Sequence, residues 1–332
     1  TSYKEGKLVT ASGQPYSGLI IPSDNTIMTE DVRNHIAQLK AQGACVLTGV
    51  KREDMESCCN PEPMRNSLGL KVIRRRNEAG YHYFIANLTP NDIDSDVNLA
   101  TGFSGLLWVD PLTGNKYAVE VQGGGKGRIK LRSGESMILQ TFNEPQPDLQ
   151  FELMPRKKFY PSKENCININ KGWKLSFIEE APKVNDTFDI DTLRTWEGVN
   201  NSSAKITMGT GVYETSFDLP SGTTDCRCTI DLGDVRESAR VYINDVYVGC
   251  AWCVPYVLNF DGKILKRIGN HIRIEVTNLP ANRIADMDRR GVQWRKFDDI
   301  NIVNINYKHR TYNRWKPMPS GLNSSVRIYL DI

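Results

Sequence analysis

Alternation of apolar and polar positions dominates the chain from about residue 70 to 142. Three stretches in this region are predicted to be β-hairpins, because short alternating segments are separated by turn-forming residues. They are KVIRRRNEAGYHYFIANL with a turn at 77–80, GLLWVDPLTGNKYAVEV with a turn at 110–115, and RIKLRSGESMILQTF. The pattern predicts an antiparallel β-sandwich or a single antiparallel sheet.

The region before these hairpins has a different pattern, which indicates a strand, a helix and a second strand. Apolar runs at 18–22 and 44–48 flank a helical stretch in which Thr29 is the expected N-cap and Gly43 the stop. The apolar residues at helical spacing are Val32, Ile36 and Leu39. Such a βαβ unit requires parallel strands. It is too short to close its own core, so we expect further sequence to precede it.

Alternating segments recur after residue 170 at fairly even spacing, without strong helix signals between them. They are GWKLSF, GVYETSFDL, CRCTIDLG, ARVYINDVYVG and NHIRIEVTNL. In the last of these, Ile272, Ile274 and Val276 share one face of the expected strand. Asn244 and Asp245 suit a tight hairpin turn. This part of the chain is therefore predicted to be a β-sandwich or jelly roll.

Proline and charged residues concentrate between the two β regions, in NEPQPDLQFELMPRKKFYPSKE. This composition is typical of a linker, and a chain of 332 residues is expected to form two or three domains. We therefore predict four parts. They are a partial α/β segment at 1–60, an antiparallel β domain at 61–145, a linker at 146–168 and a jelly-roll domain at 169–332.

The composition of the chain argues against several classes of binding partner. The net charge of +3 arises from 42 basic and 39 acidic residues, a balance too even for a chain that grips phosphate backbones, so no nucleic acid partner is predicted. The sequence has no apolar run long enough for a membrane span. Its eight cysteines are too few and too irregular for a disulfide framework. Cys226 and Cys228 are closer in sequence than is usual for zinc, so they and the Cys250–Cys253 pair are expected to pack in the core.

The second half of the chain resembles the sugar-binding jelly-roll domain of family 2 glycoside hydrolases. The stretches that carry this resemblance are GWKLSF, TLRTWEG, GTGVYETSFDLP, IDLGDVRESARVYINDVYVGCAWCVPY and GNHIRIEVTNLPANRIAD. The resemblance implies a mainly β protein. Its C-terminal galactose-binding-like jelly-roll β-sandwich would follow a smaller β-sheet domain and the short N-terminal α/β (βαβ) segment.

Nearly the whole chain resembles the C-terminal part of bacterial α-L-rhamnosidases of glycoside hydrolase family 106. In the first half, the resemblance is carried by LIIPSDNTIMTEDVRNHIAQLKAQGACVLTG, IRRRNEAGYHYFIANL, LLWVDPLTG and LRSGESMILQTF. In that family the catalytic carboxylates lie on an N-terminal (β/α)8 barrel, which does not fit into these residues. The resemblance therefore implies a non-catalytic portion of an enzyme of polysaccharide degradation, with no catalytic residue of its own.

Partners and location also follow from this resemblance. It implies an oligosaccharide or polysaccharide and the parent protein's catalytic barrel as partners, and a periplasmic or secreted location. No cofactor is expected. Jelly rolls of this type sometimes bind a structural calcium ion, for which the loop VNDTFDID at 184–191 is the candidate.

Aromatic and planar polar side chains gather in the C-terminal stretches around residues 252 and 282–315. Sugars present flat, weakly apolar faces ringed by hydroxyls, so their sites combine an aromatic platform with side chains that form paired hydrogen bonds. The predicted carbohydrate-binding residues are Trp252, Tyr256, Asn282, Arg283, Trp294, Arg295, Asn313 and Trp315.

A second interpretation gives these residues a structural role. INIVNINY at 300–307 would then be a core strand, and arginines would stack on tryptophans to cap the sandwich. The chain would be an interdomain or protein-interaction module without sugar binding. Neither interpretation favours nucleic acid, because acidic residues interrupt the positive field of this stretch; they are Asp286, Asp288, Asp298 and Asp299.

Overall fold

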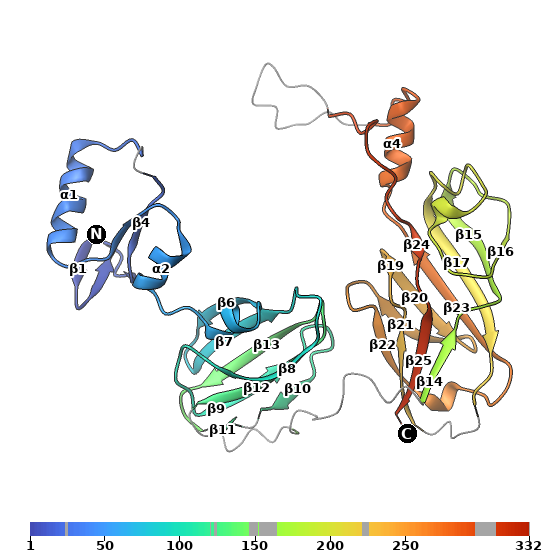
Figure 1. The fold of residues 1–332 in the computed structure, drawn as a ribbon, viewed down its shortest axis with the longest axis horizontal. Coiled ribbons are helices and arrows are strands. Elements are labelled where there is room, and N and C mark those ends of the chain that lie inside the picture. Colours follow the sequence, from blue (N-terminus) through green and yellow to red (C-terminus); the bar gives the residue numbers. More distant parts are fainter. Residues whose placement is uncertain are drawn as a thin grey trace. The chain divides into compact units, whose positions relative to one another are not determined.

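The chain forms two compact units, Thr1–Met154 and Pro155–Ile332, in a computed structural model (Figure 1). The model describes residues 1–23, 26–119, 121–122, 125–145, 152, 165–220, 226–295 and 310–331. Its described residues are mainly β and contain four α-helices, so the expected fold class is confirmed. The boundary between the units lies inside 146–168, the stretch that we expected to be a linker.

The N-terminal part of the first unit contains the predicted βαβ unit. Strands β4 (Leu19–Ile21) and β5 (Val46–Thr48) pair in parallel, and α1 (Glu30–Ala41) connects them. Thr29 stands at the N-cap of α1, as expected. A small antiparallel sheet precedes them, formed by β1 (Ser2–Lys4), β2 (Lys7–Val9) and β3 (Pro15–Tyr16). Leu39 of α1 is buried against this sheet's Leu8, whereas Val32 is exposed.

A disulfide joins Cys45, beside β5, to Cys58 at the end of α2 (Arg52–Cys58). The two cysteines are only 13 positions apart in the sequence. This pair was not predicted, because the eight cysteines do not have the regular spacing of a framework of several bridges. A single bridge leaves no spacing pattern that could be recognised in a chain of this length.

The smaller β domain is a sandwich of two antiparallel sheets. One sheet has the order β10-β9-β13-β7-β6 and the other the order β11-β12-β8. Helix α3 (Pro63–Ser67) adds Met64 to the core between them. The strands of the first sheet are β6 (Lys71–Arg76), β7 (Gly80–Ala86), β9 (Gly105–Val109), β10 (Lys116–Ala118) and β13 (Ser136–Phe142). Those of the second are β8 (Ile93–Asn98), β11 (Val121–Gln122) and β12 (Lys126–Leu131).

Two of the three predicted hairpins are confirmed, and the third is wrong. Strands β6 and β7 pair, as do β9 and β10. Strands β12 and β13 are consecutive in sequence but belong to different sheets, because β12 pairs with β8 and β13 lies between β7 and β9. The alternating pattern predicts a strand but not its partner, and here the turn crosses from one layer of the sandwich to the other.

The second unit is the predicted jelly-roll sandwich. Its two main sheets have the orders β14-β25-β18-β22 and β16-β15-β17-β23-β20-β21. The first consists of β14 (Cys166–Ile169), β25 (Val326–Asp331), β18 (Arg227–Asp231) and β22 (Val257–Asp261). The second consists of β16 (Phe188–Ile190), β15 (Trp173–Ala181), β17 (Met208–Phe217), β23 (Asn270–Thr277), β20 (Ser238–Ile243) and β21 (Val246–Ala251). The jelly roll thus begins at Cys166.

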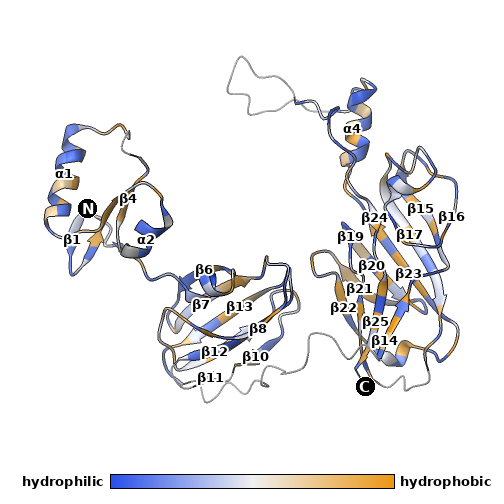
Figure 2. Cartoon of the chain, in the orientation of Figure 1, coloured by the Kyte–Doolittle hydropathy of each residue, from blue (hydrophilic) through white to orange (hydrophobic). Residues whose placement is uncertain are grey.

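Side chains of both sheets meet in one hydrophobic core. Ile272, Ile274 and Val276 of β23 are fully buried, as their alternation predicted. Figure 2 shows the alternation of hydrophobic and hydrophilic residues along strands of this sandwich. The expected tight turn at Asn244 and Asp245 is confirmed, since both residues have positive φ between β20 and β21. Cys228 lies in this core, with its Sγ 3.8 Å from that of Cys226.

Helix α4 (Ala281–Arg289) follows β23 at one end of the sandwich (Figure 1) and was not predicted. Pro280 stands at its N-cap, Ala281 and Ala285 bury one face, and Arg289 lies in the last turn, where a cation is favourable. The helix has only nine residues, and alanine is its only buried apolar residue type. A nine-residue helix is shorter than the stretches in which helical periodicity is normally recognised.

Within the described parts of the chain, no helix is both long and apolar enough to cross a membrane. The candidate core strand at 300–307 lies outside the described residues.

Candidate functional site

Helix α4 is tied to the sandwich through its first turn. The Asn282 side-chain amide donates hydrogen bonds to Glu197 Oε1 and to the Met318 carbonyl, both at 2.8 Å, and its Oδ1 accepts from the Met318 N–H at 2.8 Å. Glu197 lies in a 3-10 turn, Trp196–Gly198. Asn282 is buried, and both its amide nitrogen and its oxygen are used within the protein. It therefore positions the site and does not face a ligand.

A buried tryptophan and tyrosine support this end of the sandwich. Trp196 donates its indole N–H to Tyr213 Oη at 2.8 Å, and the backbone N–H of Leu322 donates to the same oxygen at 3.0 Å. Both rings are fully buried, and burial raises the pKa of Tyr213 far above its usual value. Leu322 belongs to β24 (Gly321–Leu322), which pairs with β19 (Val235–Arg236).

Asp288, in the last turn of α4, organises the surface next to the helix. Its carboxylate accepts hydrogen bonds from the Trp294 indole N–H and from the Tyr312 backbone N–H, each at 2.6 Å. Arg295 lies 3.9 Å away. The hydrogen bonds from Tyr312 and Trp294 hold the pKa of this carboxyl below its usual value. Asp288 therefore connects two segments that are distant in sequence.

These two segments form an aromatic cluster, which consists of Trp294, Arg295, Tyr312 and Trp315. The Arg295 guanidinium lies 4.4 Å from the centre of the Trp294 ring and 5.7 Å from that of Tyr312. The rings of Tyr312 and Trp315 are 4.5 Å apart. Trp315 remains 45% exposed, so one aromatic surface of the cluster is available to a ligand.

Arg289 fixes the chain around Trp315. It donates from Nε to the Asn313 carbonyl at 3.0 Å and from Nη2 to the Trp315 carbonyl at 2.7 Å. The Asn313 side chain is exposed on the same loop. Arg283, another residue of the predicted site, forms an ion pair with Asp286 at 3.2 Å.

The remaining two predicted residues differ in their exposure. Trp252 follows β21 and is 63% exposed, whereas Tyr256 is buried in the sandwich core, where burial raises its pKa. Ala251 pairs with Ala239, which also pairs with Val276 near the end of β23. The sheet therefore brings Trp252 to the end at which α4 begins. No ring contact joins it to the aromatic cluster within the described residues.

The structure thus brings together five of the predicted site residues around α4 and the loop at 310–316. They are Arg283, Trp294, Arg295, Asn313 and Trp315. Tyr312, Arg289 and Asp288 were not predicted as parts of this arrangement. An aromatic residue among basic ones was a signal for Tyr312, but the links from α4 could not be recognised without the helix.

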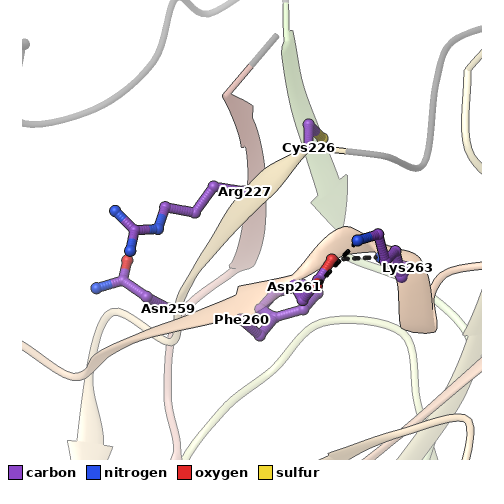
Figure 3. A pocket seen from close by; sticks show the side chains of 6 residues that line it. All are labelled: Cys226, Arg227, Asn259, Phe260, Asp261 and Lys263. Atoms are coloured by element: carbon purple, nitrogen blue, oxygen red, sulfur yellow. Dashed lines mark hydrogen bonds and ion pairs between the residues drawn. The ribbon is translucent and has the colours of Figure 1, made fainter.

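A polar pocket of about 530 Å³ lies elsewhere on the same unit (Figure 3). Its lining residues are Cys226, Arg227, Asn259, Phe260, Asp261 and Lys263. Asp261 accepts a hydrogen bond from the Lys263 backbone N–H at 3.0 Å and pairs loosely with its Nζ at 3.9 Å. Phe260 packs against the hydrophobic core. The pocket therefore lacks the exposed aromatic surface found at the α4 end.

The loop suggested for calcium places Asp186 beside Asn201. Asp186 Oδ2 accepts a hydrogen bond from the Asn201 amide at 2.8 Å. Among the described residues, no three side chains of His, Cys, Asp or Glu gather as metal ligands. We assign no step or role to a metal.

One carboxyl group in the smaller β domain has a raised pKa. Burial raises the pKa of Glu135, which accepts a hydrogen bond from the Arg132 backbone N–H at 2.7 Å. That bond closes the turn between β12 and β13. Glu135 therefore stabilises a turn, which accounts for its position without a catalytic role.

Comparison with known proteins identifies similar folds. No family model matches the chain, and no curated protein is significantly similar to it in sequence. The rhamnosidase from Novosphingobium sp. PP1Y has a similar structure, with a TM-score of 0.60 and 19% identity, over 99% of this chain. The match spans 35% of the rhamnosidase, so this chain corresponds to about a third of that protein's length.

Two β-glucuronidases have structures that align with about half of this chain. One is the FMN-binding enzyme from Facaelibacterium prausnitzii L2-6, with a TM-score of 0.31, 20% identity and coverage of 49% of this chain and 22% of that one. The other is the Bifidobacterium dentium enzyme complexed with coumarin-3-O-glucuronide, with a TM-score of 0.36, 17% identity and coverage of 52% and 31%. At these identities the likeness concerns the fold alone, and only the match to the rhamnosidase extends over nearly the whole chain among the three described.

Proposed function

We propose that this chain is a non-catalytic portion of a bacterial glycoside hydrolase of the family 106 α-L-rhamnosidase type. The match to a rhamnosidase over nearly the whole chain supports this proposal, as does the sequence resemblance described above. The parent protein degrades polysaccharide through a catalytic barrel, and this chain supports the barrel or holds glycan near it. The Cys45–Cys58 disulfide is consistent with a periplasmic or secreted location.

The α4 end of the sandwich is the proposed carbohydrate-binding surface. The single observation that carries this assignment is the exposed ring of Trp315, which is held in place by Tyr312 and by the bond from Arg289 to its carbonyl. A fixed aromatic ring beside planar hydrogen-bonding groups matches the needs of a sugar face. Trp252 is a second exposed ring at the same end of the sheet.

Titration of the purified chain with a panel of oligosaccharides tests carbohydrate binding. Shallow sugar sites have dissociation constants in the millimolar to micromolar range, which correspond to binding free energies of only about 4 to 8 kcal/mol. High ligand concentrations are therefore required. We expect heat from at least one glycan, and we expect Trp315→Ala to remove it while the melting temperature stays nearly unchanged. Absence of heat with every glycan would refute carbohydrate binding.

Incubation with aryl rhamnosides tests the non-catalytic assignment separately. No sugar should be released by the chain alone. Turnover that disappears on substitution of one carboxylate would show that the chain has its own active site.

A module that only contacts other protein domains is the second candidate. An apolar groove of about 530 Å³ in the first unit favours it, because side chains of β4 and α1 line this groove and stay partly exposed, among them Ile20 and Val32. Such a face suits contact with the catalytic barrel of the parent protein. A flat response to all glycans, together with binding of the separately produced barrel, would favour this candidate.

A further inference from the structure

Positive charge is concentrated at the α4 end of the sandwich. The described residues 281–295 and 310–320 include seven Arg or Lys and two Asp, a formal excess of five positive charges. The whole chain has a net charge of +3, so the rest of it is net negative. The positive field is therefore a local property of the proposed sugar-binding surface.

The two aspartates of this region are already engaged within the protein. Asp286 Oδ2 lies between Arg283, at 3.2 Å, and Arg290, at 2.7 Å. Asp288 accepts the hydrogen bonds from Trp294 and Tyr312 and is largely buried. Among the described residues, these two aspartates thus shape the surface and compensate only the nearest arginines.

Three other cationic side chains lie around Trp315 and can attract a negatively charged ligand. They are Arg289, Arg314 and Lys316. Arg289 donates to two backbone carbonyls, which are neutral, so its positive charge is not compensated by these bonds. Arg314 and Lys316 flank Trp315 and are exposed. In the described parts of the chain, neither of them forms an ion pair. An exposed ring therefore lies among cations that form no ion pair with the described residues.

We infer that this surface binds acidic glycans, whose sugars carry carboxylates; the inference rests on the carbohydrate-binding function proposed above. The Trp315 ring contacts the flat face of one sugar. Arg314 presents a planar fork that matches a carboxylate in a paired hydrogen bond, and Lys316 adds a second cation. A neutral glycan makes the ring contact but gains nothing from the charges.

The arrangement favours a glycan over a single-stranded nucleic acid. Nucleic acid sites of that kind stack successive bases on several exposed rings. In the aromatic cluster, Trp294 is covered by the Arg295 guanidinium and Tyr312 lies against both tryptophans, so the 45% exposed Trp315 provides the accessible ring. Trp252, the other exposed ring at this end, has no described ring contact with the cluster. One ring with adjacent cations suits one acidic sugar.

Calorimetric titration with a matched pair of ligands tests this inference. The pair is a short oligogalacturonide and the same oligomer after reduction of its carboxylates to neutral alcohols, with single-stranded DNA as a polyanion control. We expect the acidic oligomer to bind about tenfold more tightly than the neutral one at low salt, and this advantage to shrink as salt is raised, because exposed charges are screened.

Two charge-matched variants localise the effect. Arg314→Gln with Lys316→Gln should remove the preference for the acidic oligomer and leave neutral binding unchanged. Lys266→Gln with Arg267→Gln removes the same charge from two exposed residues in the loop before β23, whereas α4 follows the far end of this strand. This second variant should retain the preference.

Each result decides a different claim. Equal binding of both oligomers, or a preference that survives in the Arg314 and Lys316 variant, overturns the acidic-glycan inference and leaves carbohydrate binding standing. DNA binding as tight as that of the acidic oligomer also overturns it, because the surface would then select polyanions in general. If neither oligomer binds and no glycan of the neutral panel binds, the proposed function is overturned together with the inference.

Discussion

Individual polar residues decide the shape of the α4 end. Asp288 is the clearest example, since its carboxylate joins α4 to Trp294 and to the Tyr312 backbone. A charged acceptor forms stronger hydrogen bonds than a neutral one. The geometry of the aromatic cluster therefore depends on a residue that does not itself provide a ring or a free charge.

Asp288→Asn should lower the melting temperature by a few degrees at neutral pH. The pKa of Asp288 is depressed in the folded protein, so its contribution to stability is complete above the unfolded pKa and is lost as pH falls through the folded pKa. The difference in melting temperature between the wild type and the variant should therefore be largest above about pH 4 and shrink towards lower pH. Thermal unfolding at a series of pH values measures it. A difference that stays constant down to pH 2 would contradict this role.

Gly321 shows a second constraint at the residue scale. A Cβ at this position would lie 2.4 Å from both Trp196 Nε1 and Tyr213 Oη, and its φ of +97° is unfavourable for other residues. Gly321→Ala should lower the free energy of unfolding by roughly 3 kcal/mol, because buried rings and backbone must shift. Gly198→Ala is the control, since its nearest neighbour would be at an ordinary 3.5 Å. Denaturant unfolding of both variants provides the comparison, and equal losses would disprove the steric explanation.

At the scale of elements, the sequence predicted strands better than it predicted their partners or the short helix. The alternation of Ile272, Ile274 and Val276 was sufficient for β23, because burial of one face leaves a period of two. The separation of β12 from β13 into two sheets depends on contacts distant in sequence. Helix α4 is short, and Asn282 joins its first turn to partners that are distant in sequence.

For the candidate site, too, individual residues were predicted but their arrangement was not. Trp294 and Trp315 were predicted as site residues because aromatic residues interleaved with arginine are visible in the sequence. Their arrangement was not visible, because it is set by Asp288 and Arg289 of the unpredicted helix. Tyr256 and Asn282 have suitable chemistry for sugar binding, but the fold buries them.

Loss of the Asn282 amide should detach the first turn of α4. Asn282→Ala leaves Glu197 Oε1 and the Met318 backbone without their partner, so we expect a loss of about 2 to 3 kcal/mol in the free energy of unfolding. Glycan binding should weaken as well, because the loop that carries Trp315 begins to move. Asn168→Ala, at an exposed position of β14, should change stability by less than about 0.5 kcal/mol. A stable Asn282 variant would show that α4 is held by other contacts.

At the scale of the whole molecule, the chain consists of two units with separate hydrophobic cores. Each core is built from residues of one unit only. Units of this kind generally unfold as separate cooperative blocks. The proposed sugar-binding surface belongs entirely to the second unit.

Scanning calorimetry of the full chain should therefore resolve at least two unfolding transitions. Gly321→Ala should lower the temperature of one of them and leave the other unchanged, since Gly321 contacts only the core of the second unit. A single transition that moves as a whole in this variant would show that the two units are energetically coupled.

The central claim, that the α4 end binds carbohydrate, is tested most directly by the indole N–H signals of the six tryptophans in a nitrogen-15 NMR titration. Single Trp→Phe variants assign the signals. On addition of an oligosaccharide, the Trp315 signal should shift with saturation, and Trp252 should follow if the ligand extends along that end. The signals of the buried Trp173 and Trp196 should stay in place. Saturating glycan that leaves Trp315 and Trp252 unshifted would contradict the account.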